Sequence, residues 1–260
     1  MARSRIFHRG DCYAIGIAMD NQKRFKNRVQ AGELLARRLT AYAGRDDVIV
    51  LALPRGGVPV GAAIARKLEV SLDVLLVHKL GLPGREEYAM GAIASGGVCI
   101  LQAEVLSALD IAPEVIEEVS QREMREIKRR EKLYRAGRPA PQLRERVVIL
   151  ADDGLATGST MQVAVHVVRE LNPARLIVAV PVAPQETCEK LKSEADEIIC
   201  LSMPEPFHAV GLWYENFEQT SDGEVTSLLE EVEKERAQRT RPLHVSRKKT
   251  GGAGDAVHTK

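Results

Sequence analysis

A buried-strand pattern that ends in two acidic residues constrains this chain more than any other feature. Residues 147–151 read Val-Val-Ile-Leu-Ala, and Asp152 and Asp153 follow at once. A continuous apolar, β-branched run of this kind is typical of a parallel strand that is covered on both faces. Open α/β sheets bind ligands at the carboxyl ends of such strands. We therefore expect the acidic pair to lie at a ligand-binding edge.

The segment after the acidic pair has the composition of a phosphate-binding loop. Thr157, Gly158, Ser159 and Thr160 come just before an apolar pattern with helical spacing. Small residues at a helix start leave backbone N–H groups and hydroxyls free to bind an anion, which the helix dipole also favours. Gly158 lets the backbone approach closely. A phosphate monoester fits here, and the alternative is an ordinary strand-to-helix turn with Ser159 as N-cap.

Two carboxylates beside a phosphate loop would repel a bare polyanion. They need hydroxyl donors or a cation between themselves and the ligand, and a ribose diol with Mg²⁺ nearby supplies both. Hydrogen bonds to charged acceptors contribute about 1.5–3 kcal/mol each. The combined pattern predicts a sugar-phosphate site.

Residues 148–160 resemble the phosphoribosyl pyrophosphate (PRPP) binding motif of type I phosphoribosyltransferases, in which an apolar run and an acidic pair precede Thr-Gly-x-Thr. The resemblance covers about residues 25–227. It implies that Asp152 and Asp153 hold the ribose 2′ and 3′ hydroxyls, and that Mg²⁺ is carried mainly by PRPP and reached by these carboxylates through water. It also implies a 5′-phosphate loop made of Ala156, Thr157, Gly158, Ser159 and Thr160.

A second loop has the same placement, at residues 53–59 with the sequence Leu-Pro-Arg-Gly-Gly-Val-Pro. It follows a predicted buried strand over residues 48–53 and precedes a helical pattern, so its N–H groups and one guanidinium are expected at the same sheet edge. In the family that it resembles, this loop binds the leaving pyrophosphate, often through a non-proline cis peptide. That role falls here to Arg55, Gly56 and Gly57. The alternative is a Gly-rich turn without a ligand.

Residues 78–88 are expected to form a long, polar, Gly-rich loop between two strands. The family has a flexible lid at this place, which closes over PRPP and excludes water. The resemblance implies that Lys79 and Arg85 contact pyrophosphate in the closed state. A purely structural loop with exposed basic side chains is the alternative.

Aromatic side chains gather in residues 202–220. The chain has 1 Trp, 5 Tyr and 4 Phe in all, and this segment holds Phe207, Trp213, Tyr214 and Phe217. Flat rings can stack on a heterocyclic base, so the segment is a candidate for the family's hood over the acceptor, with Phe207, Trp213 and Tyr214 as acceptor-binding residues. A small satellite core or a dimer contact explains the cluster equally well.

Strand and helix patterns alternate from about residue 47, which predicts an α/β fold with a doubly wound, mostly parallel sheet. The expected strands are residues 48–53, 72–78, 92–101, 147–151, 175–182 and 197–201. The expected helices are residues 28–39, 58–68, 106–134 with a new start at Pro113, 163–171 and 185–193.

The predicted organisation has three parts: an N-terminal extension over residues 1–24, a phosphoribosyltransferase domain over residues 25–235, and a disordered basic tail over residues 236–260. Met19 is an alternative start to Met1. The charged helix over residues 114–135 has a narrow apolar seam, typical of a surface or dimer helix. The resemblance to type I phosphoribosyltransferases implies a homodimer, to which this helix is a candidate contributor.

Charge and composition exclude several classes of protein. Lys and Arg number 37 and Asp and Glu 36, so no global field recruits nucleic acid or a membrane surface. No apolar run approaches membrane-spanning length, and the N-terminal residues lack a secretory pattern. The 4 Cys have neither zinc-site nor disulfide-framework spacing. We expect a cytoplasmic protein.

The leading hypothesis is transfer of a 5-phosphoribosyl group from PRPP to a nitrogen acceptor, a nucleobase or related heterocycle, with release of pyrophosphate. The motifs do not specify the acceptor. The alternative is a regulatory protein that keeps the fold and senses PRPP or a nucleotide without turnover. PRPP synthesis ranks last, because no ATP-binding element accompanies the motif.

Overall fold

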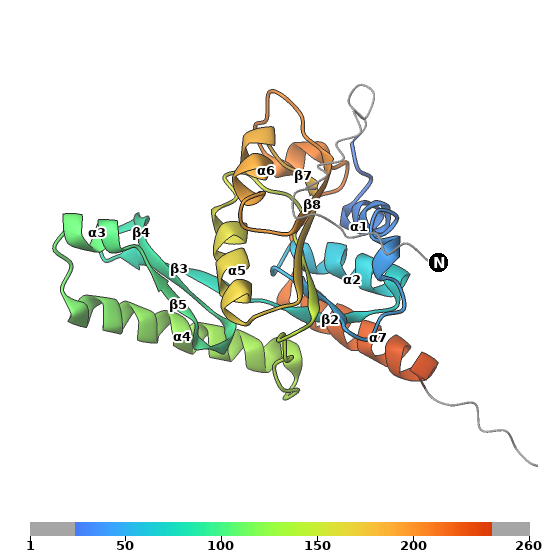
Figure 1. Ribbon diagram of the computed structural model, residues 1–260, viewed down its shortest axis with the longest axis horizontal. Helices are drawn as coiled ribbons and strands as arrows, with labels where there is room; N and C mark the ends of the chain where they lie inside the picture. Colours follow the sequence, from blue (N-terminus) through green and yellow to red (C-terminus); the bar gives the residue numbers. More distant parts are fainter. Residues whose placement is uncertain (1–23, 241–260) are drawn as a thin grey trace, which may run out of the picture.

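A five-stranded parallel sheet with strand order β2-β1-β6-β7-β8 forms the centre of the molecule (Figure 1). The computed structural model describes residues 24–240, apart from the side chains of residues 85–88, 103–104 and 240. All the ladders of this sheet are parallel, which confirms the predicted fold class. The strands are β1 (Val48–Ala52), β2 (Ser71–Val74), β6 (Val147–Ala151), β7 (Arg175–Val182) and β8 (Glu197–Ser202).

Helices cover both faces of this sheet, because successive side chains of a strand point to opposite sides. Val50 and Ala52 of β1 belong to one hydrophobic cluster, whereas Ile49 and Leu51 belong to the other. Fully burying one such aliphatic side chain contributes about 1.5–3 kcal/mol. The first cluster includes side chains of α1 (Arg28–Ala36), α2 (Gly57–Leu68) and α7 (Asp222–Thr240), and the second includes side chains of α5 (Ser159–Glu170) and α6 (Gln185–Leu191).

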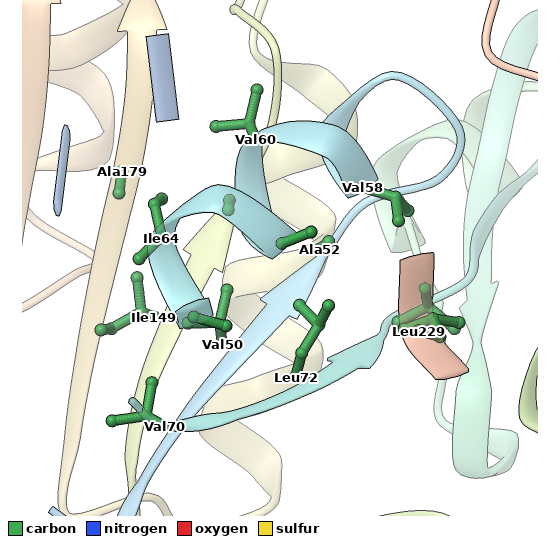
Figure 2. Close-up of a cluster of buried hydrophobic side chains, with 14 of the residues drawn as sticks. Val50, Ala52, Val58, Val60, Ile64, Val70, Leu72, Ile149, Ala179 and Leu229 are labelled. Carbon is green, nitrogen blue, oxygen red and sulfur yellow. The ribbon is translucent and has the colours of Figure 1, made fainter. Parts of the chain in front are cut away.

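Figure 2 shows part of the first cluster. Ile64 of α2 lies beside Val50 of β1 and Ile149 of β6, whereas Leu229 of α7 lies on the side of Val58 and Leu72. The aliphatic side chains from helices and strands interdigitate, so the sheet gives the loops at its carboxyl edge a rigid base. Within the described residues, the short 3₁₀ helices η1 (Thr40–Tyr42) and η3 (Val210–Trp213) belong to the central part, and η2 (Ser95–Gly97) belongs to residues 77–135.

Residues 77–135 form an arm that extends away from the central sheet (Figure 1). Its three strands pair antiparallel in the order β3-β4-β5. As predicted, a helix begins at Pro113, where proline is well suited to the first helical position. The elements of the arm are β3 (Val77–Leu82), β4 (Arg85–Ala94), β5 (Cys99–Leu101), α3 (Ala103–Ala108) and α4 (Pro113–Arg135).

The arm corrects two predictions. Residues 78–88 do not form an irregular loop, because β3 and β4 make a hairpin that turns at Pro83 and Gly84. The predicted strand at residues 92–101 is the end of β4 and a separate β5. Leu80 and Met90 are 0% exposed and anchor the hairpin in the first hydrophobic cluster. The glycines and proline near the turn obscured this alternating pattern in the sequence.

Helix α7 corrects the boundary of the predicted tail. It continues to Thr240, five residues beyond the expected end of the domain at residue 235. Val225, Leu229 and Val232 are buried with helical spacing, and ion pairs join Arg236 to Asp46 and Arg239 to Glu69. The alternative start at Met19 and the remainder of the predicted tail lie outside the described residues.

Candidate functional site

The two predicted ligand loops lie side by side at the carboxyl edge of the central sheet. Ala52 at the end of β1 is in register with Ala151 at the end of β6. The N–H of Leu53 donates to the carbonyl oxygen of Ala151 over 2.9 Å, which joins the start of one loop to the end of the neighbouring strand. Parallel pairing therefore brings together segments that are about a hundred residues apart in the sequence.

The loop after β1 contains a cis peptide between Pro54 and Arg55, in agreement with the form that the resemblance implied. The following glycines allow a very close approach to the acidic pair. A Cβ atom on Gly56 would lie 2.0 Å from Oδ2 of Asp153, and one on Gly57 would lie 3.0 Å from Oδ1 of Asp152. The close approach of the loop to the acidic pair explains why glycine stands at both positions. A turn that packed against nothing would accept larger residues there.

The acidic pair is held by its own backbone and by burial. Oδ1 of Asp152 accepts a hydrogen bond from the N–H of Asp153 over 2.8 Å. Burial raises the pKa of Asp152 well above its usual range, and the negative charge of Asp153 raises it further. Burial also raises the pKa of Asp153, but a hydrogen bond from Arg28 and its positive charge oppose this rise. The pair thus brings two carboxyl groups together in a largely buried position, where burial disfavours their charge and Arg28 offsets it.

The predicted phosphate loop ends at the start of α5. Gly158 has φ = 74°, a conformation that favours glycine, and it is the N-cap residue of the helix. Thr157 and Ser159 bond to each other through their hydroxyl oxygens, which are 2.9 Å apart. The side chains of Ala156, Thr157 and Thr160 are exposed. The first-turn N–H groups of α5 have no partner within the helix and can bind an anion.

Thr187 supports this loop from α6, a role that the sequence did not indicate. Its hydroxyl donates to the carbonyl oxygen of Ala156 over 3.0 Å. Its Cγ2 atom would lie 2.5 Å from a Cβ atom on Gly158. A lone threonine at the start of a helix carries no recognisable pattern, so only the tertiary structure reveals this contact.

Arg28 is the second residue that the sequence did not single out. It lies at the first position of α1, and its Nε donates to Oδ2 of Asp153 over 2.8 Å. Its Nη1 donates to the carbonyl oxygen of Glu218 over 2.7 Å, and its guanidinium lies 3.8 Å from the centre of the Phe217 ring. No local motif surrounds this arginine, so its position became evident only from the fold.

The aromatic segment, which we call the hood (residues 202–220), forms a small core of its own against the N-terminal part of the domain. Tyr214 is 3% exposed, and the centre of its ring lies 5.5 Å from that of Phe25 and 5.0 Å from that of Phe217. Its hydroxyl donates to the carbonyl oxygen of Asp153 over 2.5 Å. A ring covered in this way has no free face for a base. The structure therefore favours a supporting role for Tyr214 over the predicted stacking role.

The other two stacking candidates differ from Tyr214. Phe207 and Trp213 pack against the same small core but are only half-buried. The peptide bond between Glu205 and Pro206 is cis and precedes Phe207 directly. These two rings keep exposed surface, so they remain candidates for contact with an acceptor.

The two basic residues of the predicted lid lie on the arm. Lys79 is exposed on β3, and the backbone of Arg85 begins β4 across the turn. Among residues 24–240, no hydrogen bond or ion pair joins the Lys79 side chain to either ligand loop. The contact of these two residues with pyrophosphate stays a prediction.

Neither a preformed metal cluster nor a membrane-spanning helix occurs in the described part of the chain. Over residues 24–240, His, Cys, Asp and Glu side chains form no group of three or more that could hold a metal ion. None of the helices in that range has both the length and the apolar character needed to cross a bilayer.

Comparison with known proteins agrees with this geometry. Two proteins of Mycobacterium tuberculosis, from strains CDC 1551 and H37Rv, are each 39% identical over 216 residues, and their names give phosphoribosyl transferase as a provisional assignment. The match covers 83% of this chain but 48% of theirs, so the chain spans about half the length of these curated relatives.

A solved structure and a family model extend the comparison. The crystal structure of TT1426 from Thermus thermophilus is 41% identical with a TM-score of 0.71, over 80% of this chain and 98% of that one. The family model described as the phosphoribosyl transferase domain matches residues 20–215, which include both ligand loops, the arm and most of the hood. The chain therefore belongs to the phosphoribosyl transferase domain family.

Proposed function

We propose that this protein transfers a 5-phosphoribosyl group from PRPP to a nitrogen acceptor and releases pyrophosphate. The observation that carries the proposal is the contact between the two loops, where Gly56 leaves no room for a Cβ atom beside Asp153. An acidic pair for hydroxyls and a helix start for a phosphate then lie at one edge, and the neighbouring loop carries Arg55, whose guanidinium we assign to the pyrophosphate.

Each part of PRPP has a partner in this arrangement. Asp152 and Asp153 accept hydrogen bonds from the ribose 2′ and 3′ hydroxyls, and the loop from Ala156 to Thr160 binds the 5′-phosphate. The backbone of Gly56 and Gly57 and the Arg55 side chain receive the pyrophosphate. Lys79 and Arg85 of the arm contact the same pyrophosphate in the closed state.

The donor set suits a magnesium ion that arrives with its substrate. Two adjacent carboxylates lie at the edge, and Mg²⁺ in phosphate sites keeps several waters while using few carboxylates and the substrate's own phosphate oxygens. Asp152 and Asp153 would reach it through water. When bound, the ion neutralises charge on the pyrophosphate.

The reaction forms one bond and breaks another at C1 of the ribose. The acceptor nitrogen attacks C1, the bond from C1 to the pyrophosphate oxygen breaks with its electron pair, and the nitrogen loses a proton. Charge leaves with the pyrophosphate, so stabilisation by Arg55 and by backbone N–H groups lowers the barrier. Rigid placement on the carboxyl edge supplies the remaining catalysis through orientation.

The acceptor is expected to lie under the hood, where Phe207 and Trp213 keep exposed ring surface. One observation favours a second function. Because the Tyr214 ring is covered, less aromatic surface is available for an acceptor than the sequence suggested. A regulatory protein that binds PRPP or a nucleotide without turnover would need no acceptor surface at all.

A homodimer accompanies this proposal. Leu101, Leu109 and Leu133 are 42–44% exposed on the arm, and a second copy of the chain would cover such apolar side chains. Sedimentation equilibrium of the wild type tests it, and a monomer at micromolar concentration would reject it.

Calorimetric titration with PRPP, with and without Mg²⁺, tests the donor site. We expect the Asp152→Asn, Asp153→Asn double variant to lose at least about a hundredfold in affinity, because two charged acceptors are removed. The matched control is Asp46→Asn, Asp47→Asn, since these carboxylates precede β1 at the opposite edge of the sheet. Absence of PRPP binding by the folded wild type would overturn the proposal.

Turnover separates the enzyme from the sensor. Once PRPP binding is established, pyrophosphate release is measured against a panel of nitrogen heterocycles. Release with any acceptor supports the transferase, whereas tight PRPP binding with no release across the panel supports the regulatory protein.

A further inference from the structure

Arg28 connects three parts of the molecule that are distant in sequence. Its side chain is 11% exposed and lies beneath the hood, next to Asp153, whose side chain is 15% exposed. One edge of the guanidinium pairs with this carboxylate, another nitrogen bonds the carbonyl oxygen of Glu218, and the planar face covers the Phe217 ring. Arginine is suited to this place, because it can pair, donate and stack at the same time.

We propose that Arg28 is a positioning residue that ties the hood to the second carboxylate of the acidic pair. The inference rests on the proposed function for the identity of the two ligands. Arg28 orients Asp153 toward the ribose, and through Phe217 and Glu218 the same side chain holds the end of the hood over the acceptor. Neither ligand needs to contact the arginine itself.

The contact leaves Asp153 able to accept further donors. A carboxylate has about four acceptor positions on its two oxygens, and Arg28 uses one of them on Oδ2. Gly56 packs against the same oxygen, so the carboxylate cannot turn toward the loop after β1. Together, the arginine and the glycine restrict the carboxylate to one orientation.

The hood is attached at several points, and Arg28 supplies the one nearest its C-terminal end. Another is a backbone attachment, in which the N–H of Phe25 donates to Trp213 and the N–H of Glu215 donates to Phe25, each over 2.8 Å. Beyond Asn216, the side chain of Arg28 provides the contacts to Phe217 and Glu218 described above. Loss of the arginine should therefore loosen Phe217 and Glu218, although the Phe217 ring keeps its contact with Tyr214, while the earlier part stays in place.

Hydrogen exchange on the ligand-free full chain tests the coupling, with mass spectrometry of peptides that cover residues 214–221. We expect Arg28→Met to speed exchange of the last hood amides at least about tenfold, with the arm unchanged. Asp153→Ala should speed this exchange by a similar factor, because Asp153 holds the Arg28 side chain in place. The double variant should exchange little faster than either single variant. Wild-type exchange in Arg28→Met would overturn the coupling.

Variants of matched chemistry separate positioning from simple stability. Arg28→Lys keeps the charge beside Asp153 and should retain most of the PRPP affinity, whereas Arg28→Met should lose about tenfold or more. Phe217→Ala should release the hood but change PRPP affinity less than about threefold. Arg66→Met is the control, because Arg66 pairs with Glu231 and Glu235 of α7, away from the hood.

The two proposals fail in different ways. If the wild type binds no PRPP in calorimetry, the proposed function fails, and hydrogen exchange still decides whether Arg28 holds the hood. If PRPP binds but Arg28→Met binds it as well as the wild type, Arg28 does not orient Asp153 and the inference is overturned. Melting temperature and circular dichroism verify that each variant is folded.

Discussion

The carboxyl edge of the sheet and the arm hold their charged residues in contrasting ways. At the edge, close packing fixes the acidic pair and Gly56. The space between Gly56 and Asp153 is too small for a residue with a Cβ atom. On the arm, Lys79 is exposed on a two-stranded hairpin whose anchors are apolar. Close packing restricts which residues a position accepts, and exposure leaves that choice open. Site residues are therefore easier to recognise at the edge than on the arm.

Of the single substitutions, the largest effect on PRPP affinity is expected from one methyl group at the edge. Gly56→Ala places a Cβ atom 2.0 Å from Oδ2 of Asp153, so the carboxylate or the loop must move. PRPP affinity should fall about a hundredfold, as for the loss of a charge-assisted hydrogen bond. Calorimetry measures the loss.

The matched change on the arm is Gly84→Ala. Gly84 has φ = 77°, and apart from its chain neighbours no heavy atom lies within 4 Å of the place that a Cβ atom would take. The substitution should cost about 1 kcal/mol of unfolding free energy through backbone strain and leave PRPP affinity unchanged. If Gly56→Ala and Gly84→Ala bind PRPP with equal affinity, the edge is no more important for PRPP binding than the arm.

The junction of the two regions contains a buried ion pair. Arg135 of α4 bonds Asp73 of β2, and their side chains are 7% and 13% exposed. Arg135→Met should lower the unfolding free energy by about 3–5 kcal/mol, because it leaves a buried carboxylate unpaired. Urea unfolding at neutral pH measures this cost, and Asp73→Asn in the same chain should restore much of it.

The cost should depend on pH in a defined direction. Burial already raises the pKa of Asp73, and the positive charge of Arg135 opposes that rise. Removing Arg135 therefore raises the pKa of Asp73 further. The unfolding free energy of Arg135→Met is therefore lowered only while Asp73 is ionised. Its deficit relative to the wild type should shrink as pH falls through this raised pKa. A deficit that grows toward acid pH would contradict the assignment.

The interior of the arm should affect stability without affecting ligand binding. Leu80→Ala removes a side chain that is 0% exposed, which should cost about 2–5 kcal/mol in thermal or urea unfolding. Leu133→Ala is the control, since Leu133 is 42% exposed and should cost well under about 1 kcal/mol. A large drop in PRPP affinity for folded Leu80→Ala would show that the arm belongs to the binding site.

The smallest effect is expected from the charge on the arm. Arg55→Met should weaken pyrophosphate binding about tenfold to a hundredfold, through the loss of charge-assisted hydrogen bonds. Lys79→Met should weaken it less than about threefold, because an exposed charge contributes little. Titration of both variants with pyrophosphate gives the comparison. Equal losses would indicate that the arm closes over the ligand.

Local sequence predicted the centre of the fold well. Continuous apolar runs identified β1, β6 and β7 to within one residue of their observed ends. The acidic pair and the two glycines of the loop after β1 were assigned from short motifs, and the structure brings them into contact. These features depend on neighbours along the chain and on parallel pairing, and both leave a pattern in the sequence.

Long-range contacts explain what local patterns missed. The hairpin of β3 and β4 depends on Leu80 and Met90 reaching the core, and helix α7 depends on Val225, Leu229 and Val232 packing against distant elements. The glycines near the turn made the hairpin look like a loop, and the basic residues at the end of α7 made that end look like a tail. Their stability comes from burial against segments far away in the chain, which a local window does not contain.

The sequence by itself determined the parallel α/β character of the fold, most strands of the central sheet and the residue types of the two loops, because periodicity and short motifs encode them directly. Only the tertiary structure decided that Arg28 and Thr187 support those loops, and that the Tyr214 ring is covered by Phe25 and Phe217. The physical reason is that a hydrogen bond or a ring contact between distant segments depends on the geometry of the whole fold.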